Sequence, residues 1–269
     1  MKHLQTGEFH GQTNTTIDLD GIILTDTEYT LDKVDWHYHE NVYFTFILQG
    51  NVIEGNKKEV YSCTTGSLLF HNWHEPHYNI KPAGFTRGFH AEVEHDWFNN
   101  FSFSIDELQG SINISNPDTR FLFYKIFKES KKGGDLSALS IQALLLQVFA
   151  QLLRNNAVEQ NNKPLWVGKI KERLHEEYCK NHTLEDLAKT LGIHPVHLSR
   201  YFPKYFNCSL SEYIRKLRIE KSLALLSNRK FSLTEIALEC GFADQSHFNR
   251  CFKEIMGINP FAYKKLLLS

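Results

Sequence analysis

The spacing of apolar residues changes along this chain. Up to about residue 115, short runs rich in β-branched and aromatic residues, such as Val42–Leu48 and Ser67–Phe70, alternate with Gly- and Asn-containing turns. From about residue 117, apolar residues recur at three- and four-residue steps, which predicts one helix up to Gly133-Gly134 and another over Leu136–Arg154. Short strands followed by helices favour a β-sandwich or barrel with flanking helices.

The predicted helix over Leu136–Arg154 is apolar on more than one side. Packing against a single hydrophobic core explains only one apolar side of a helix. Two interpretations therefore stay open: burial within the monomer, and contact with a second copy of the chain. Three glutamines interrupt the apolar run, and we therefore expect no membrane span. The first apolar side consists of Leu139, Ala143, Leu146, Ala150 and Leu153, and the second of Ile141, Leu144, Leu145, Val148 and Leu152.

The segment 155–163 is polar and without periodicity, which predicts a linker between a domain over 1–154 and a second over 164–269. Charge is divided along the same line. From Lys163 onward there are 18 Lys and Arg against 11 Asp and Glu, whereas the preceding residues hold 12 against 20. The C-terminal part can therefore neutralise phosphates and release counterions, although the whole chain carries a net charge of −1.

The five cysteines are scattered, odd in number and without a C-x-x-C pair. We expect them to be thiols in a cytoplasmic protein, and the N-terminus shows no secretion-type segment.

Two stretches of the C-terminal part repeat each other at an offset of 49 and then 50 residues. Thr183 and Ser232 each stand three residues before an acidic residue, as helix N-caps do. Gly192 and Gly241 follow at the place where each first helix must end. The repeat predicts two helix–tight turn–helix units joined by one helix over Leu210–Leu226, whose basic residues Arg215, Lys216, Arg218 and Lys221 we expect on the surface.

The second helix of each unit carries an outward polar stripe. Arginine can pair with guanine, and asparagine or glutamine with adenine, through two hydrogen bonds. Contact with phosphates or water is the alternative for each single residue, and it stays open here. The connecting helix would hold both stripes over successive major-groove turns, about 34 Å apart. The candidate DNA contacts are Val196, Ser199 and Arg200 in the first unit, and Gln245, Ser246, Asn249 and Arg250 in the second.

The segment from Leu184 to Tyr263 resembles the AraC/XylS-type DNA-binding domain. The densest match comprises Ile236-Ala237, Gly241-Phe242, Asp244-Gln245-Ser246, Phe248, Arg250, Phe252-Lys253, Gly257 and Pro260–Tyr263. The resemblance implies a domain of seven helices and sequence-specific promoter binding, and it gives the same seven residues as base contacts. Two positions depart from the family pattern: Asn259 replaces a serine, and Pro203 is expected to bend its helix or to end it early.

The N-terminal part contains His37-Tyr38-His39 at a strand start and His77 further along, and it resembles a cupin barrel of the sensory kind. Metal-binding cupins add a glutamate, but Tyr43 or its neighbours stand at that position here. A metal site, a metal-free effector pocket and a structural role are the three interpretations. We adopt the effector pocket, with His37, His39, Tyr43 and His77 as ligand contacts and neither metal nor cofactor. Its expected walls are Trp36, Tyr43, Phe70 and Trp73.

The sequence therefore predicts an α+β chain of two domains, a cupin-like β-barrel with flanking helices and an all-α domain with two helix-turn-helix motifs. We expect a transcription regulator of the bacterial type that is not an enzyme. Its expected partners are double-stranded promoter DNA, a small-molecule effector and a second copy of the chain, with contact to RNA polymerase left open. A cupin metalloenzyme that carries a DNA-binding domain is the alternative. Effector, operator and direction of regulation are not given by the sequence.

Overall fold

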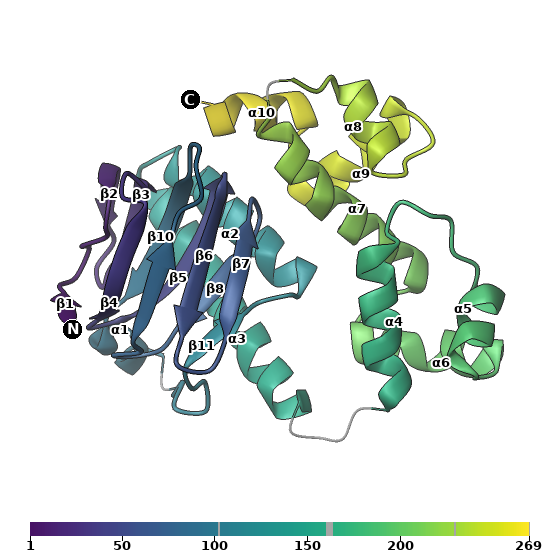
Figure 1. The fold of residues 1–269 in the computed structure, drawn as a ribbon, viewed down its shortest axis with the longest axis horizontal. Coiled ribbons are helices and arrows are strands. Elements are labelled where there is room, and N and C mark those ends of the chain that lie inside the picture. The colour runs from purple at the N-terminus through teal and green to yellow at the C-terminus, as the bar shows by residue number, and fades with distance from the viewer. Residues whose placement is uncertain (102, 160–163, 229, 269) are drawn as a thin grey trace. The chain divides into compact units, whose positions relative to one another are not determined.

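The structure is a computed structural model that describes residues 1–101, 103–159, 164–228 and 230–268, without side chains at 155–159 and 268. The chain divides into two compact units, Met1–Asn156 and Ala157–Ser269. The first unit is rich in β-strands and the second is helical (Figure 1). The expected fold class, a β-domain followed by an all-α domain, is thereby confirmed. Each unit is described by itself.

Two sheets form the N-terminal unit (Figure 1). The first sheet has the spatial order β1 (Lys2–Leu4), β4 (Lys33–His39), β9 (His77–Ile80), β6 (Asn51–Asn56) and β7 (Val60–Thr64). The second has the order β11 (Ser111–Asn113), β8 (Leu68–His71), β5 (Val42–Gln49), β10 (Arg87–Val93), β3 (Ile22–Glu28) and β2 (Gln12–Asp18). Most pairings are antiparallel, and β1 joins β4 in parallel.

Strand β5 is buried along Val42–Leu48, which explains its nearly unbroken apolar sequence. Alternate side chains point to opposite faces of the sheet. Phe44 lies 4.8 Å from Phe123 of helix α2 (Pro117–Ser130), measured between ring centroids, and 5.4 Å from Phe149 of helix α3 (Asp135–Glu159). Helices α2 and α3 thus cover one face of the second sheet. The short helix α1 (His95–Asn99) follows β10 directly.

Helix α3 is buried on one side only. Ile141, Leu145, Val148, Phe149 and Leu152 are buried, whereas Leu136 and Leu139 are 82% and 65% exposed. Of the two apolar sides expected from the sequence, the side of Ile141 therefore packs in the core and the side of Leu139 faces away from it. Its stretch Asp135–Arg154 has the length and composition of a membrane span, with a mean hydropathy of 1.7, but core helices share these properties. That the chain has no membrane span stays a prediction.

Helix α3 continues to Glu159, so the expectation of an irregular linker from residue 155 is wrong for 155–159. Extending an existing helix fixes few further torsions, and Ala157 and Glu159 are good helix formers. Positions 160–163 lie outside the described residues, and the domain boundary within this segment stays a prediction.

The C-terminal unit consists, in its described part, of the seven helices that the resemblance implied. Their common element is α7, which packs against helices of both halves of the unit. The predicted bounds of α7 agree with the structure. The helices are α4 (Leu165–Glu176), α5 (Leu184–Leu191), α6 (Pro195–Phe206), α7 (Leu210–Leu226), α8 (Leu233–Glu239), α9 (Gln245–Met256) and α10 (Pro260–Leu268) (Figure 1).

Candidate nucleic-acid interface and ligand pocket

Each first helix of the repeat begins at a hydroxyl cap. The Thr183 side chain accepts a hydrogen bond from the Asp186 amide at 3.1 Å. Ser232 accepts from the Glu235 amide at 3.2 Å, and the Glu235 carboxylate accepts from the Ser232 amide in return, which completes a capping box. These bonds satisfy amides that helix geometry leaves without a partner. The two N-caps predicted from the sequence repeat are therefore both present in the structure.

The second helices α6 and α9 also begin and end at defined caps. Pro195 occupies the first turn of α6, and the Asp244 carboxylate accepts from the His247 amide at the start of α9. The expectation that Pro203 ends α6 early is wrong, because α6 continues to Phe206. A proline removes one backbone hydrogen bond, and Phe202 stacked on Phe206 at 4.1 Å anchors this last turn in the core.

Five of the seven candidate DNA contacts are exposed on α6 and α9: Val196, Ser199, Arg200, Ser246 and Arg250. Leu198 and Phe248 on the opposite sides of these helices are fully buried. In the described part of the chain, neither Arg200 nor Arg250 forms an ion pair with an acidic residue. Both guanidinium groups are therefore available to an external partner, and base contact by these residues stays a prediction.

Gln245 and Asn249 are half-buried. Thr234 of α8 donates to the Gln245 amide oxygen at 2.6 Å, so that side chain is held against the preceding helix. The Asn249 amide oxygen is buried and has no hydrogen-bond partner among the described residues. The side chains of Gln245 and Asn249 are thus less available to an external partner than the exposed Arg250 on the same helix.

Arg218 corrects the expectation that the basic residues of α7 lie on the surface, because it is 8% exposed. Its guanidinium donates to the carbonyl oxygens of Tyr178 and Lys180, both at 2.9 Å. The same group lies 6.0 Å from the ring centroid of Phe242, in the turn between α8 and α9. Arg218 therefore connects the segment before α5 with the turn of the second motif. Buried charge needs such partners, and backbone carbonyls supply them here.

The two turn glycines differ in their surroundings. Both have positive φ, +66° at Gly192 and +81° at Gly241, which glycine tolerates best. A Cβ atom on Gly192 would meet nothing within 4 Å, whereas on Gly241 it would lie 2.5 Å from the Cys179 carbonyl oxygen. The second turn thus packs directly on the backbone segment that Arg218 holds.

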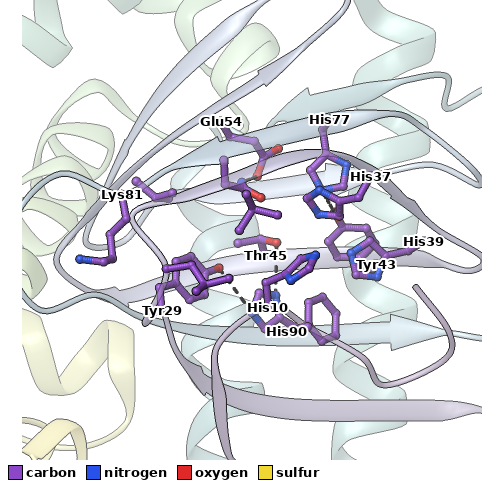
Figure 2. Close-up of a pocket in the computed structure, with 15 residues that line it drawn as sticks. His10, Tyr29, His37, His39, Tyr43, Thr45, Glu54, His77, Lys81 and His90 are labelled. Atoms are coloured by element: carbon purple, nitrogen blue, oxygen red, sulfur yellow. Dashed lines mark hydrogen bonds between the residues drawn. The ribbon is translucent and has the colours of Figure 1, made fainter. Parts of the chain in front are cut away.

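A pocket of about 480 Å³, its opening included, lies between the two sheets of the N-terminal unit (Figure 2). His37, His39, Tyr43 and His77, which we predicted as ligand contacts, all line it and gather at one end. Ligand binding by them stays a prediction. The other lining residues were not predicted from the sequence: Phe9, His10, Tyr29, Leu31, Val34, Thr45, Val52, Glu54, Asn79, Lys81 and His90.

Of the aromatic residues predicted as pocket walls, Tyr43 lines the pocket, and the prediction is wrong for the other three. Trp36 is 40% exposed and packs on Tyr78, and Trp73 packs near α1 on Phe98. Phe70 points to the face of its sheet that the helices cover, 6.4 Å from Phe149. The outcomes at Trp36 and Phe70 follow from strand register, since a shift of one position exchanges the two faces of a strand, whereas Trp73 lies in the turn after β8. The apolar wall instead includes Phe9, stacked on His90 at 3.8 Å.

Histidine side chains make close contacts at one end of the pocket. His37 and His77 are direct partners in the β4–β9 pairing, and their ring centroids lie 4.1 Å apart. The ligand nitrogens of His37, His39 and His77 all lie within 4.8 Å of one another. The Tyr43 hydroxyl lies 2.8 Å from Nε2 of His77.

Burial keeps the pocket largely uncharged at neutral pH. It lowers the pKa of His37 to about 4 and that of His77 and His90 to about 3, because an imidazolium would lose its hydration. Neighbouring histidines add to the effect for His39, whose pKa is also lowered. Burial raises the pKa of Glu54 to about 8.

Glu54 was missed because no motif marks a lone glutamate in a strand. Glu54 is 2% exposed, and Asn79 donates to one of its carboxylate oxygens at 3.1 Å. The other oxygen lies 3.1 Å from Nε2 of His71, but the alignment is not that of a hydrogen bond. Both of these atoms are therefore buried without a hydrogen-bond partner in the part that the structure describes.

The N-terminal segment runs along the pocket. The Gly7 amide donates to the Glu92 carboxylate at 2.7 Å, and Asn41 donates to that carboxylate and to the Thr6 hydroxyl. These bonds place Phe9 and His10 against the histidines.

Comparison with known proteins bears on the C-terminal unit first. Residues 187–266 match a family model described as a helix-turn-helix domain. The Msm operon regulatory protein of Streptococcus mutans is 34% identical over 123 residues, 45% of this chain and 44% of that protein. The chain carries an AraC-type helix-turn-helix domain. The resemblance stated from the repeat is thereby confirmed, and the AraC-type domain accounts for α5 to α10.

Two further comparisons extend beyond the AraC-type domain. The transcriptional activator RhaR of Mannheimia succiniciproducens is 23% identical over 251 residues, which cover 85% of this chain and 86% of RhaR. A structure of ToxT from Vibrio cholerae covers 91% of this chain and 99% of its own, with 16% identity and a TM-score of 0.40. The chain spans less than half the length of several curated relatives that it matches, the Msm protein among them.

Proposed function

We propose that this chain is a sequence-specific DNA-binding transcription regulator whose affinity for DNA is set by a small molecule bound in the N-terminal pocket. The observation that carries the proposal is the pair of capped helices α6 and α9, which expose polar and arginine side chains. A recognition helix reads the major groove in this way. The relatives named above are regulators of transcription, which supports a regulator in the cytoplasm rather than an enzyme.

The basic balance of the C-terminal part supports affinity for DNA of any sequence. An excess of Lys and Arg over Asp and Glu releases counterions from the duplex, and this contribution weakens as salt rises. Specificity comes instead from base edges. Arg200 and Arg250 occupy corresponding places of the repeat and have no acidic partner in the described residues. We assign base contacts to them and to Val196, Ser199, Gln245, Ser246 and Asn249.

The pocket supports an effector that is small, polar and without strong charge. Hydroxyl, imidazole and amide groups converge in it beside the apolar Phe9, Val34 and Val52. An effector acts on DNA affinity only through a difference in its own affinity for two states of the protein. His37, His39, Tyr43 and His77 are the contacts that we assign to it.

The exposed side of α3 supports a homodimer. Leu136 and Leu139 are exposed at one end of this side, and Ala143 and Ala150 continue it along the helix. A contiguous apolar surface of this kind on a folded unit marks a contact site. Dimerisation through the N-terminal unit would give the assembly two AraC-type domains.

The test is selection of bound duplexes from random double-stranded DNA by the full chain, followed by measurement of Arg250→Ala on the selected site. We expect affinity for that site to fall about 5- to 150-fold, since a bidentate base contact contributes about 1–3 kcal/mol. Affinity for random DNA should change little. Lys253→Ala, an exposed change on the same helix, is the matched control and should weaken both alike. Failure to select any sequence would overturn the proposal.

A further inference from the structure

We propose that His37, His39 and His77 bind one divalent transition-metal ion, with Zn²⁺ as the best fit, inside the N-terminal pocket. Nothing in the DNA-binding half of the chain enters this inference. It deepens the proposed effector site, because the three side chains line the same pocket (Figure 2).

The first support is the placement of the three imidazoles on paired strands. His37 and His77 are register partners in β4 and β9, and His39 follows two residues later on the same face as His37. Their ligand nitrogens lie within 4.8 Å of one another. Tetrahedral Zn²⁺ with Zn–N of about 2.0–2.1 Å separates its ligand nitrogens by roughly 3.3–3.4 Å. Small ring rotations are therefore enough to bring the three atoms into ligand positions.

The second support is the orientation of two of the rings. Nδ1 of His37 lies 2.9 Å from the Asp35 carbonyl oxygen, and Nδ1 of His77 lies 3.1 Å from the Glu75 carbonyl oxygen. A carbonyl oxygen only accepts, so both Nδ1 atoms carry the proton and both Nε2 atoms keep a lone pair. A histidine that binds a metal commonly donates its other ring nitrogen to a backbone carbonyl in this way.

The third support is a buried polar atom without a partner. His39 is 2% exposed, and its Nδ1 has no hydrogen-bond partner among the described residues. An unsatisfied buried polar group costs about 1–3 kcal/mol. An ion in the centre of the three rings would fix the orientation of His39 and recover part of this cost.

The site leaves a fourth position for an external ligand. Three histidines and one open position are the ligand set of catalytic zinc sites and also suit other imidazole-binding ions. The Tyr43 hydroxyl, 2.8 Å from Nε2 of His77, must donate to that nitrogen, because Nδ1 already carries the proton. When the ion takes this lone pair, the hydroxyl becomes free to donate to a bound water or to an oxygen atom of the effector. At this step alone, the inference rests on the proposed function.

The experiment uses the full chain, stripped with a chelator and then dialysed against Zn²⁺ or Co²⁺. We expect one equivalent of Zn²⁺ per chain by elemental analysis, and the strong visible absorption of four-coordinate Co²⁺. His39→Ala and His77→Ala should each weaken Zn²⁺ binding by at least about 100-fold, since a change outside the ligand set already costs about 10–100-fold.

His90→Gln is the matched control, because His90 is equally buried in the same pocket but does not belong to the three. It should keep the full equivalent of metal. Less than half an equivalent in the unsubstituted chain, or a six-coordinate Co²⁺ spectrum, would overturn the site. Equal binding by His77→Ala would overturn it as well. Because the unsubstituted chain is measured first, a variant that fails to fold does not decide the result.

The two proposals fail separately. A chain that selects a DNA sequence but binds no Zn²⁺ overturns the metal site alone. A chain that binds one Zn²⁺ through these histidines but selects no DNA sequence overturns the regulator and leaves the metal site standing.

Discussion

The polar residues assigned to function are buried in the N-terminal unit and mostly exposed in the C-terminal unit. His37, His39 and His77 are each 2–3% exposed, whereas Arg200 and Arg250 are open to solvent. The pocket residues come from both sheets and from the N-terminal segment. Each recognition helix instead presents its polar stripe from a single run of residues. The two regions therefore differ in how closely binding and folding depend on each other.

In the C-terminal unit the scaffold and the surface are separable. The caps of the helices and the Arg218 contacts hold the motifs, and the exposed stripes contribute little to this framework. In the N-terminal unit the same imidazoles line the pocket and fill the space between the sheets. A substitution there changes packing and ligand contact together.

The largest effect on stability is expected from Gly241→Ala. A left-handed backbone costs alanine about 1–2 kcal/mol, and overlap with the Cys179 carbonyl adds about 1–3 kcal/mol. The free energy of unfolding should therefore fall by about 2–5 kcal/mol. Urea titration of the full chain, followed by circular dichroism of the helices, measures the loss.

Gly192→Ala is the matched control for this comparison, since it stands at the corresponding turn of the first motif in open space. It should lose only about 1–2 kcal/mol, the backbone term alone. Equal losses at the two glycines would mean that the second turn does not depend on its contact with Cys179.

Much of the C-terminal unit could be predicted from its sequence because its signals are local. Caps at Thr183 and Ser232, turn glycines and the 3.6-residue period each act within a few residues of the chain. Arg218 was misplaced because its partners, the carbonyls of Tyr178 and Lys180, are about forty residues away and carry no side-chain signal. Sequence periodicity does not report backbone acceptors.

The pocket was predictable only through its histidines. The H-x-H spacing places His37 and His39 on one face of a strand, and the resemblance to a barrel suggested His77. Glu54 and His90 reach the pocket through strand pairing, which sequence spacing does not determine. Trp36 and Phe70 failed as walls for the same reason, because the register that decides their direction is a tertiary property.

Glu54→Gln is expected to have an intermediate effect on the free energy of unfolding, and this effect depends on pH. With its pKa raised to about 8 by burial, folded Glu54 keeps its proton while the unfolded chain loses it above its ordinary value. Unfolding free energy therefore falls as pH rises from about 5 to 8. The variant should remove this loss, so its free energy of unfolding relative to the unsubstituted chain should be on the order of 3 kcal/mol higher at pH 8 than at pH 5.

The buried histidines have the opposite effect on the pH dependence of the free energy of unfolding. Their lowered pKa values mean that the unfolded chain takes up protons first as pH falls below about 6.5, so acid destabilises the folded unit. Urea titrations between pH 5 and 8, with chelator present, should show greatest stability near pH 6.5. A constant difference between Glu54→Gln and the unsubstituted chain over this range would contradict the burial of an ionisable Glu54.

The smallest effect on the stability of the monomer is expected from Leu139→Lys, because this side chain is 65% exposed. The free energy of unfolding should change by less than about 0.5 kcal/mol. The proposed homodimer should nevertheless dissociate, since a lysine in its apolar contact surface would be desolvated without a partner. Sedimentation at several concentrations measures the change. Ser62→Lys, an exposed change on strand β7 and outside α3, serves as control. A monomeric unsubstituted chain would remove the dimer from the proposal.

The hold that Arg218 exerts on backbone oxygens has an evolutionary consequence. Main-chain carbonyls are present whatever residues occupy positions 178 and 180. The Arg218 hydrogen bonds therefore tolerate substitution of the side chains at these positions. If the exposed stripes of α6 and α9 contact bases as we propose, they can mutate toward a new DNA sequence while the placement of the two motifs stays the same. The Arg218 contacts would thus allow related chains to bind different promoters while the domain keeps its structure.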